Sequence, residues 1–240
     1  MSFGKYFNKG QKVFIRRLYS DEKPPTVDTI TGYAMHSQPM QLDLALPYGS
    51  DTADSYPFEP GMKFEIMTDS KGMGLRLTAS FIEKISSQDI RLEFAGDLEF
   101  ISRRTYPRVD VNAWVGLKRG AGTLSEMRQL WREHMDKIKA GVSAEELTEF
   151  NKYLVNLAGG GIRLPMQPPV DMAELVLIYL SIGDKKGIIC GLAEVIWVGE
   201  EQSNGLQLGG LRFLKILEED QARLDAVVNR LLARLDQAGQ

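Results

Sequence analysis

The chain has 240 residues, of which 29 are lysine or arginine and 32 are aspartate or glutamate, so its formal net charge is −3. This nearly even balance argues against a protein that binds DNA or RNA through overall charge. With 43% hydrophobic and 25% charged residues, the composition is typical of a globular protein with one large or two small cores, and not of a disordered or fibrous one.

Features of secreted, membrane-spanning and common catalytic proteins are missing from the sequence. The segment from Met1 to Val13 mixes lysines with aromatic residues and has no continuous apolar stretch of the kind a signal peptide needs. The longest largely apolar run, Leu175 to Ile182, is much shorter than the roughly 20 residues that span a bilayer. We therefore expect a cytoplasmic protein without membrane insertion. A single cysteine, Cys190, and two histidines, His36 and His134, disfavour metal cages and histidine-based triads, so we expect no enzyme.

Between Lys12 and Ile101, apolar residues recur at every second position, which is typical of half-buried strands. The alternating sets are Met40, Leu42, Leu44 and Leu46, then Phe64 and Ile66, then Met73, Leu75 and Leu77, then Ile90, Leu92 and Phe94. Short runs rich in glycine, proline and aspartate separate these sets and indicate turns. Short strands joined by short turns predict a small antiparallel β-barrel over residues 1–101.

A second series of strand-like runs follows Pro107 and predicts a second barrel domain over residues 102–240. The runs are Val109 to Leu117, Tyr153 to Leu157, Ile162 to Leu164, Leu175 to Ile182, Ile188 to Val198 and Leu206 to Phe213. The last part of the chain changes to helical spacing, with Leu217, Leu224, Val228, Leu231 and Leu235 on one face. We expect a helix over residues 217–236 that packs onto the barrel.

Two capping boxes interrupt the second series of strands. Thr123-Leu-Ser-Glu126 and Ser143-Ala-Glu-Glu146 each predict the start of a helix, and Gly141 marks the end of the first. The first helix carries a stripe of Leu124, Met127, Trp131, Met135 and Ile138, and the second carries Leu147, Phe150 and Leu154. A stripe of this kind is more often core than interaction face. Because it has its own start and stop signals, we expect the insertion, about residues 120–152, to be an autonomous helical hairpin used for association.

The densest positive charge lies between the two predicted domains, in Ser102-Arg103-Arg104-Thr105-Tyr106-Pro107-Arg108. Pro107 disfavours the helical region for Tyr106, so the segment is extended or turned. In an extended chain Arg104 and Arg108 share a face about 13 Å apart. Their guanidinium groups suit phosphate and the O6/N7 edge of guanine, although a charge run of this kind is more often a solvated linker.

A glycine run, Asn156-Leu-Ala158-Gly-Gly160-Gly161, lies between two predicted strands. Successive glycines permit positive φ angles and let the backbone approach a ligand closely, and they also simply make tight turns. The run is followed by Ile162-Arg163-Leu164 and lacks the Gly-Lys-Ser/Thr of a phosphate-binding loop, so that motif is excluded.

Together and in this order, the two features resemble the PilZ domain of bacterial cyclic di-GMP receptors, whose signature is RxxxR followed by [D/N]xSxxG. Arg104 and Arg108 match the first motif, and Asn156 and Gly161 match the second. The strand Glu194 to Val198, the strand Gly210 to Phe213 and the final helix resemble the family as well. A leading all-β domain resembles the two-domain YcgR-type arrangement of flagellar brake proteins. The resemblance implies a mostly β fold with an N-terminal split barrel and a C-terminal PilZ barrel.

The resemblance also implies cyclic di-GMP as ligand, with no cofactor and no metal. The implied roles are phosphate and guanine binding by Arg104 and Arg108, reinforcement by Arg103, a guanine contact by Asn156, an open turn at Gly160 and Gly161, and a place beside the ligand for Ala158. Ligand binding would change the interdomain arrangement and signal to a protein partner such as the flagellar motor, surface-polymer machinery or a secretion apparatus, with effects on motility or biofilm formation. A homodimer is a further candidate assembly.

Two departures from the family pattern keep an alternative open. The serine of the second motif is Ala158, which removes one hydroxyl, and the insertion lengthens the distance between the motifs. The alternative is a degenerate PilZ protein that no longer binds the nucleotide and acts as a protein-interaction scaffold.

Overall fold

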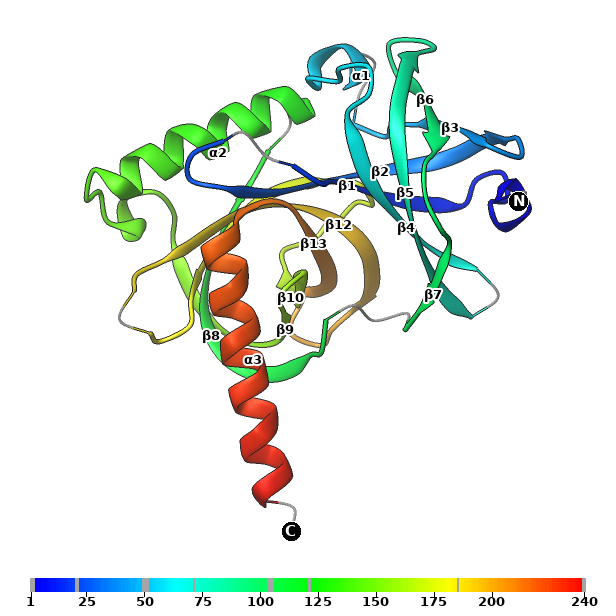
Figure 1. Ribbon diagram of the computed structural model, residues 1–240. Coiled ribbons are helices and arrows are strands. Elements are labelled where there is room, and N and C mark those ends of the chain that lie inside the picture. The colour runs from blue at the N-terminus through cyan, green and yellow to red at the C-terminus, as the bar shows by residue number, and fades with distance from the viewer. Residues whose placement is uncertain are drawn as a thin grey trace. The chain divides into compact units, whose positions relative to one another are not determined.

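A computed structural model describes residues 3–19, 22–48, 52–70, 72–102, 106–120, 122–184 and 186–238 (Figure 1). The chain forms two compact units. The first comprises Met1–Glu22, Val27–Thr105 and Thr123–Ser125, and the second comprises Lys23–Thr26, Tyr106–Gly122 and Glu126–Gln240.

The first unit is a closed antiparallel barrel. Its elements are η1 (Gly4–Tyr6), β1 (Lys12–Arg17), β2 (Thr26–Ser37), β3 (Gln41–Ala45), α1 (Thr52–Ser55), β4 (Lys63–Ser70), β5 (Met73–Lys84), β6 (Asp89–Phe94) and β7 (Glu99–Ile101). Six strands pair in the order β1-β4-β5-β6-β3-β2 and return to β1, and β7 pairs with β5. Alternate residues fill the interior, among them Val13, Ile15, Leu42, Leu44, Phe64, Ile66, Leu75, Leu77, Ile90 and Leu92. The predicted period-two strands are confirmed.

The second unit closes another antiparallel barrel. Its elements are β8 (Val109–Arg119), α2 (Leu124–Lys139), η2 (Ala144–Glu146), β9 (Phe150–Ala158), β10 (Gly161–Met166), β11 (Leu175–Ser181), β12 (Ile189–Glu201), β13 (Gln207–Leu217) and α3 (Glu218–Ala238). The strands pair in the order β8-β9-β10-β13-β12-β11 and return to β8. The buried interior includes Val115, Val155, Leu157, Ile162, Leu164, Leu192, Val195 and Leu211. The predicted mostly β fold class is therefore confirmed.

The final helix, α3, begins directly after β13, and its first turn carries three acidic residues that suit the positive end of the helix dipole. Leu224, Val227 and Val228 are buried, whereas Leu235 near the end of the helix is 60% exposed. In Figure 1 the first turns of α3, in orange, lie against the strands of its unit, and the last turns, in red, extend beyond them. The predicted helix is confirmed, although Leu217 belongs to β13.

The prediction of a second helix in the insertion is wrong. Ser143 N–H donates to Oε1 of Glu146 at 3.3 Å, as a capping box requires, but the helical geometry covers only Ala144–Glu146. Strand β9 then begins at Phe150 and pairs with β8 along its length. Pairing in a closed barrel satisfies the backbone groups of this segment and buries Val155, so it outweighs the local helix signal.

Helix α2 is confirmed, but it does not stand apart from the barrel as an autonomous hairpin would. Met127, Trp131 and Met135 are all buried. The indole Nε1–H of Trp131 donates to the carbonyl oxygen of Cys190 on β12 at 3.1 Å. An isolated short helix is marginal in water, so its apolar stripe needs cover, and here the strands of its own unit provide a partner.

Candidate functional site

The arginine-rich segment enters the second unit just before β8. Arg103 and Arg104 lie outside the described residues. Arg108 is exposed and directly precedes Val109, which pairs with Leu157 on β9. The start of β8 therefore lies beside the end of β9, where the glycine run begins.

The glycine run forms the turn of the β9–β10 hairpin, with Ala158 paired to Gly161 across it. None of the three glycines has a left-handed φ. Each instead has a close neighbour: a Cβ atom at Gly159 would overlap Asp225 of α3, and one at Gly161 would overlap the carbonyl oxygen of Leu211. The need for glycine here comes from close packing of neighbouring elements, and not from the backbone angles that glycine permits.

The middle glycine is covered by a tyrosine of the arginine-rich segment. A Cβ atom at Gly160 would lie 2.6 Å from Cδ2 and 2.8 Å from Cε2 of Tyr106, so the tyrosine ring packs directly on this residue. Tyr106 lies between the two motif arginines, Arg104 and Arg108. The structure therefore brings Tyr106 against the glycine turn, although the two are distant in sequence.

A row of polar side chains crosses the outer face of the barrel beside this turn. Asp110, Asn156 and Arg163 are neighbours in register on β8, β9 and β10. The amide Nδ2–H of Asn156 donates to Oδ1 of Asp110 at 2.8 Å, and Nη2 of Arg163 lies 3.7 Å from the same oxygen. Asp110 was not among the residues predicted from sequence, because only the strand register places it beside Asn156.

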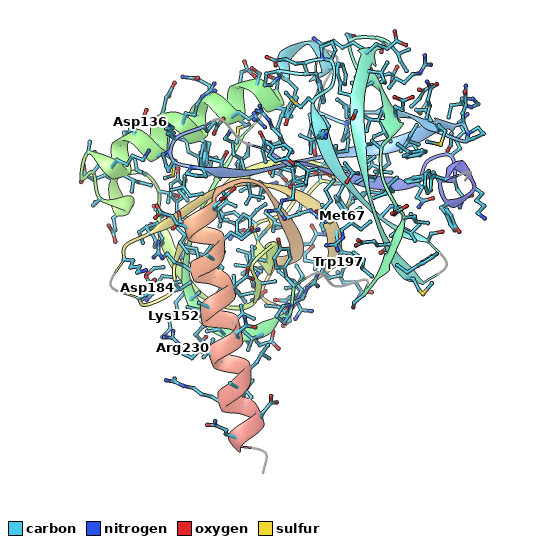
Figure 2. The ribbon with its side chains drawn as sticks, in the orientation of Figure 1. Met67, Asp136, Lys152, Asp184, Trp197 and Arg230 are labelled. Carbon is cyan, nitrogen blue, oxygen red and sulfur yellow. The ribbon has the colours of Figure 1, made fainter. Side chains whose placement is uncertain are left out.

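The same row continues to an exposed tryptophan. Arg163 pairs with Gly210 on β13, and Gly210 pairs with Trp197 on β12. Trp197 is 47% exposed, and Cβ atoms at Gly210 and Gly199 would lie 3.4 Å and 2.6 Å from atoms of its side chain. Two glycines thus let the indole lie flat on the barrel surface, where Figure 2 labels it. The sequence places Trp197 only within a predicted strand, because Gly210 is brought beside it by the pairing of β12 with β13.

The three predicted positions on the turn itself differ in accessibility. Ala158 is only 5% exposed, whereas Gly160 and Gly161 are both half-buried. The backbone N–H of Phe213 donates to the carbonyl oxygen of Gly160 at 3.1 Å, which ties the turn to β13. Direct contact with a ligand is therefore easier for the glycines than for the Ala158 methyl group.

Two other kinds of feature are absent from the described part of the chain. Within it, no group of three or more His, Cys, Asp or Glu side chains is arranged to hold a metal ion. None of the helices in the described ranges is both long and apolar enough to cross a bilayer.

Comparison with solved structures finds several proteins of similar length but low identity. Bacillus subtilis inhibitor of motility, MotI/DgrA, is 16% identical with a TM-score of 0.39, over 95% of this chain and 99% of that one. Escherichia coli YcgR, solved in complex with c-di-GMP, is 13% identical with a TM-score of 0.38, over 96% and 87%. Apo MrkH of K. pneumonia is 13% identical with a TM-score of 0.42, over 95% and 88%.

A search of curated proteins finds no match to this sequence. The family model for the PilZ domain matches residues 102–230, which is more than half of the chain. The match includes the arginine segment, the glycine turn, the polar row and most of α3. The chain belongs to the PilZ domain family.

Proposed function

We propose that the chain is a cytoplasmic bacterial effector that binds cyclic di-GMP. The observation that carries this proposal is the packing of Tyr106, which lies between Arg104 and Arg108 in the sequence, on Gly160 of the second motif. The family match and the polar row beside the turn support it further.

The residues around the turn offer the chemistry that a cyclic dinucleotide needs. Arg104 and Arg108 supply guanidinium groups for phosphate and for the O6/N7 edge of guanine, with Arg103 beside them. Asn156 offers an amide to a base edge, and the exposed ring of Trp197 is a surface on which a base can stack. The glycines of the turn let Tyr106 and β13 pack closely against it.

Ligand binding at the arginine-rich segment would change the arrangement of the two domains. The arginines lie on the connection that leads into the second unit, so a ligand that holds them restricts that connection. A ligand that binds one domain arrangement more tightly shifts the population toward it. We propose that this shift is read by a protein partner in motility, biofilm or secretion, and that no covalent bond is made or broken.

A second function is favoured by one observation. Residue 158 is alanine and its methyl group is almost fully buried, so the hydroxyl of the family motif is missing from the turn. A PilZ barrel that has lost its ligand would serve as a protein-interaction scaffold.

Calorimetric titration of the full chain with cyclic di-GMP separates the two functions. The proposal expects saturable binding that Arg104→Ala and Arg108→Ala each abolish, with the thermal midpoint nearly unchanged because these exchanges remove ligand contacts and little core. Arg132→Ala is the matched control, since this exposed arginine of α2 contacts Gln129 of its own helix. A wild-type chain without measurable binding would overturn the proposal and favour the scaffold.

A further inference from the structure

A hydrogen bond joins the side chains of Asn156 and Asp110, whose positions are 46 apart in the sequence. Asn156 Nδ2 donates to Asp110 Oδ1 at 2.8 Å, and the two residues face each other across β8 and β9. The guanidinium group of Arg163 lies 3.7 Å from the same carboxylate oxygen. The Asp110 carboxylate is thus approached by two donors, one from β9 and one from β10.

The chemistry of the carboxylate decides which way the amide points. An ionised carboxylate only accepts hydrogen bonds, whereas an asparagine side chain has one donating NH₂ group and one accepting carbonyl oxygen. The amide must therefore point its nitrogen toward Asp110, so the carbonyl oxygen Oδ1 of Asn156 points away from Asp110. Without such a partner, the two orientations of an exposed amide are nearly equal in energy.

A fixed carbonyl oxygen distinguishes between purine bases. The Watson–Crick edge of guanine offers the N1–H and N2–H donors, while adenine offers the acceptor N1 beside its N6–H donor. A carbonyl oxygen that faces this edge can accept from either of two adjacent donors of guanine, but from only the N6–H of adenine, whose N1 would be left facing an acceptor. An amide free to flip accommodates either base. Unpaired polar groups in a binding site reduce affinity for the wrong ligand, so the orientation has energetic consequences.

We propose that Asp110 is a specificity-determining positioning residue: it holds the Asn156 amide so that its carbonyl oxygen meets a guanine base. The inference rests on the proposed function. Arg163 completes the arrangement, because its positive charge lies beside Asp110 and reduces the repulsion between this carboxylate and an anionic dinucleotide. Asp110 itself acts through Asn156.

An exchange of the two residues tests this role. The affinities of the full chain for cyclic di-GMP and cyclic di-AMP are measured by calorimetry for wild type, Asp110→Asn, Asn156→Asp and the double variant. Asp110→Asn places two amides side by side, and these can pair in either orientation. The Asn156 amide is then no longer fixed, so the preference for cyclic di-GMP falls about tenfold, which corresponds to one hydrogen bond. Asn156→Asp places two carboxylates together and weakens binding of both ligands.

The double variant gives the decisive result. The amide introduced at position 110 would donate its NH₂ group to the carboxylate introduced at position 156. The other oxygen of that carboxylate accepts from guanine, so the preference for cyclic di-GMP returns to within a few fold of wild type. Asp136→Asn, an exposed carboxylate of α2 labelled in Figure 2, controls for the loss of one negative charge and leaves the preference unchanged.

The outcomes separate this inference from the proposed function. If wild type binds cyclic di-GMP and Asp110→Asn retains the full preference, the positioning role is overturned and the receptor function stands. A double variant as unselective as Asp110→Asn also overturns the role. If wild type binds neither dinucleotide, the proposed function fails and this inference fails with it.

Discussion

Asp225 of α3 lies directly over Gly159 in the turn of the β9–β10 hairpin, so that a Cβ atom at that position would overlap Oδ1 of the carboxylate. Gln221, one turn earlier on α3, donates from Nε2 to the carbonyl oxygen of Gly159 at 3.2 Å. Burial raises the pKa of the Asp225 carboxyl. The turn of the candidate ligand site is therefore in contact with the C-terminal helix.

The exchange Gly159→Ala is expected to destabilise the packing of α3 against the β9–β10 turn. Inserting a methyl group into a packed contact costs about 1–3 kcal/mol, which lowers the thermal midpoint. Asp225→Ala removes the group that the new methyl would meet, so the double variant should lose less stability than the two single variants together. Thermal unfolding of the four proteins measures this coupling. Additive losses would show that α3 is not held at this contact.

The exchange Trp131→Ala is expected to cost about 3–5 kcal/mol of unfolding free energy, as for other large buried aromatic side chains. Trp131 is only 3% exposed, and its indole nitrogen is hydrogen-bonded to β12. Leu235→Ala on the exposed part of α3 is the comparison and should change stability by less than about 0.5 kcal/mol. Denaturant titration gives both values. If both variants lost equally little unfolding free energy, the insertion would be an independent hairpin after all.

Stability should also fall with acidification through His134. This histidine of α2 is buried and forms a hydrogen bond with the hydroxyl of Tyr179 on β11. Burial and the positive charges of Lys118 and Lys137 hold the pKa of His134 below its usual value, and the charge of Glu133 opposes them. Burial raises the pKa of Tyr179, so its hydroxyl stays protonated and suits the role of donor to neutral His134.

The sign of the pH effect follows from this shift. A histidine whose pKa is lowered in the folded state binds its proton more readily when the chain is unfolded, so stability is present above about pH 6.5 and is lost as the pH falls below it. His134→Asn keeps an acceptor at the Nδ1 position and does not titrate. The difference in thermal midpoint between wild type and His134→Asn should shrink from about pH 8 to about pH 5.5, a range that brackets the usual histidine pKa. A constant difference would contradict a neutral, buried His134.

The exchange Ala158→Ser restores the hydroxyl of the family motif. One hydrogen bond is worth about 0.5–1.5 kcal/mol, so affinity for cyclic di-GMP should be kept or should rise by no more than about tenfold. Calorimetric titration of wild type and variant checks this. Because Ala158 is almost fully buried, a marked loss of affinity would mean that the site is built around a methyl group at this position.

Much of the fold was determined by local sequence pattern. The alternation of Leu42 with Leu44 and of Leu75 with Leu77 predicts strands, because a period of two puts one face of each strand in the core wherever its neighbours lie. Helix α3 was equally predictable from its spacing. The family of the second domain followed from the order of the arginine and glycine motifs.

Other features were decided only by the tertiary structure. Ser143 opens a capping box, yet the residues after it form a strand because β8 provides a partner that no local signal can reveal. Sequence shows that Gly159 and Gly160 are glycines but not why, since the reason lies in Asp225 and Tyr106, which reach them from distant parts of the chain. Such contacts depend on strand register and helix docking, and these are set by the packing of the whole barrel.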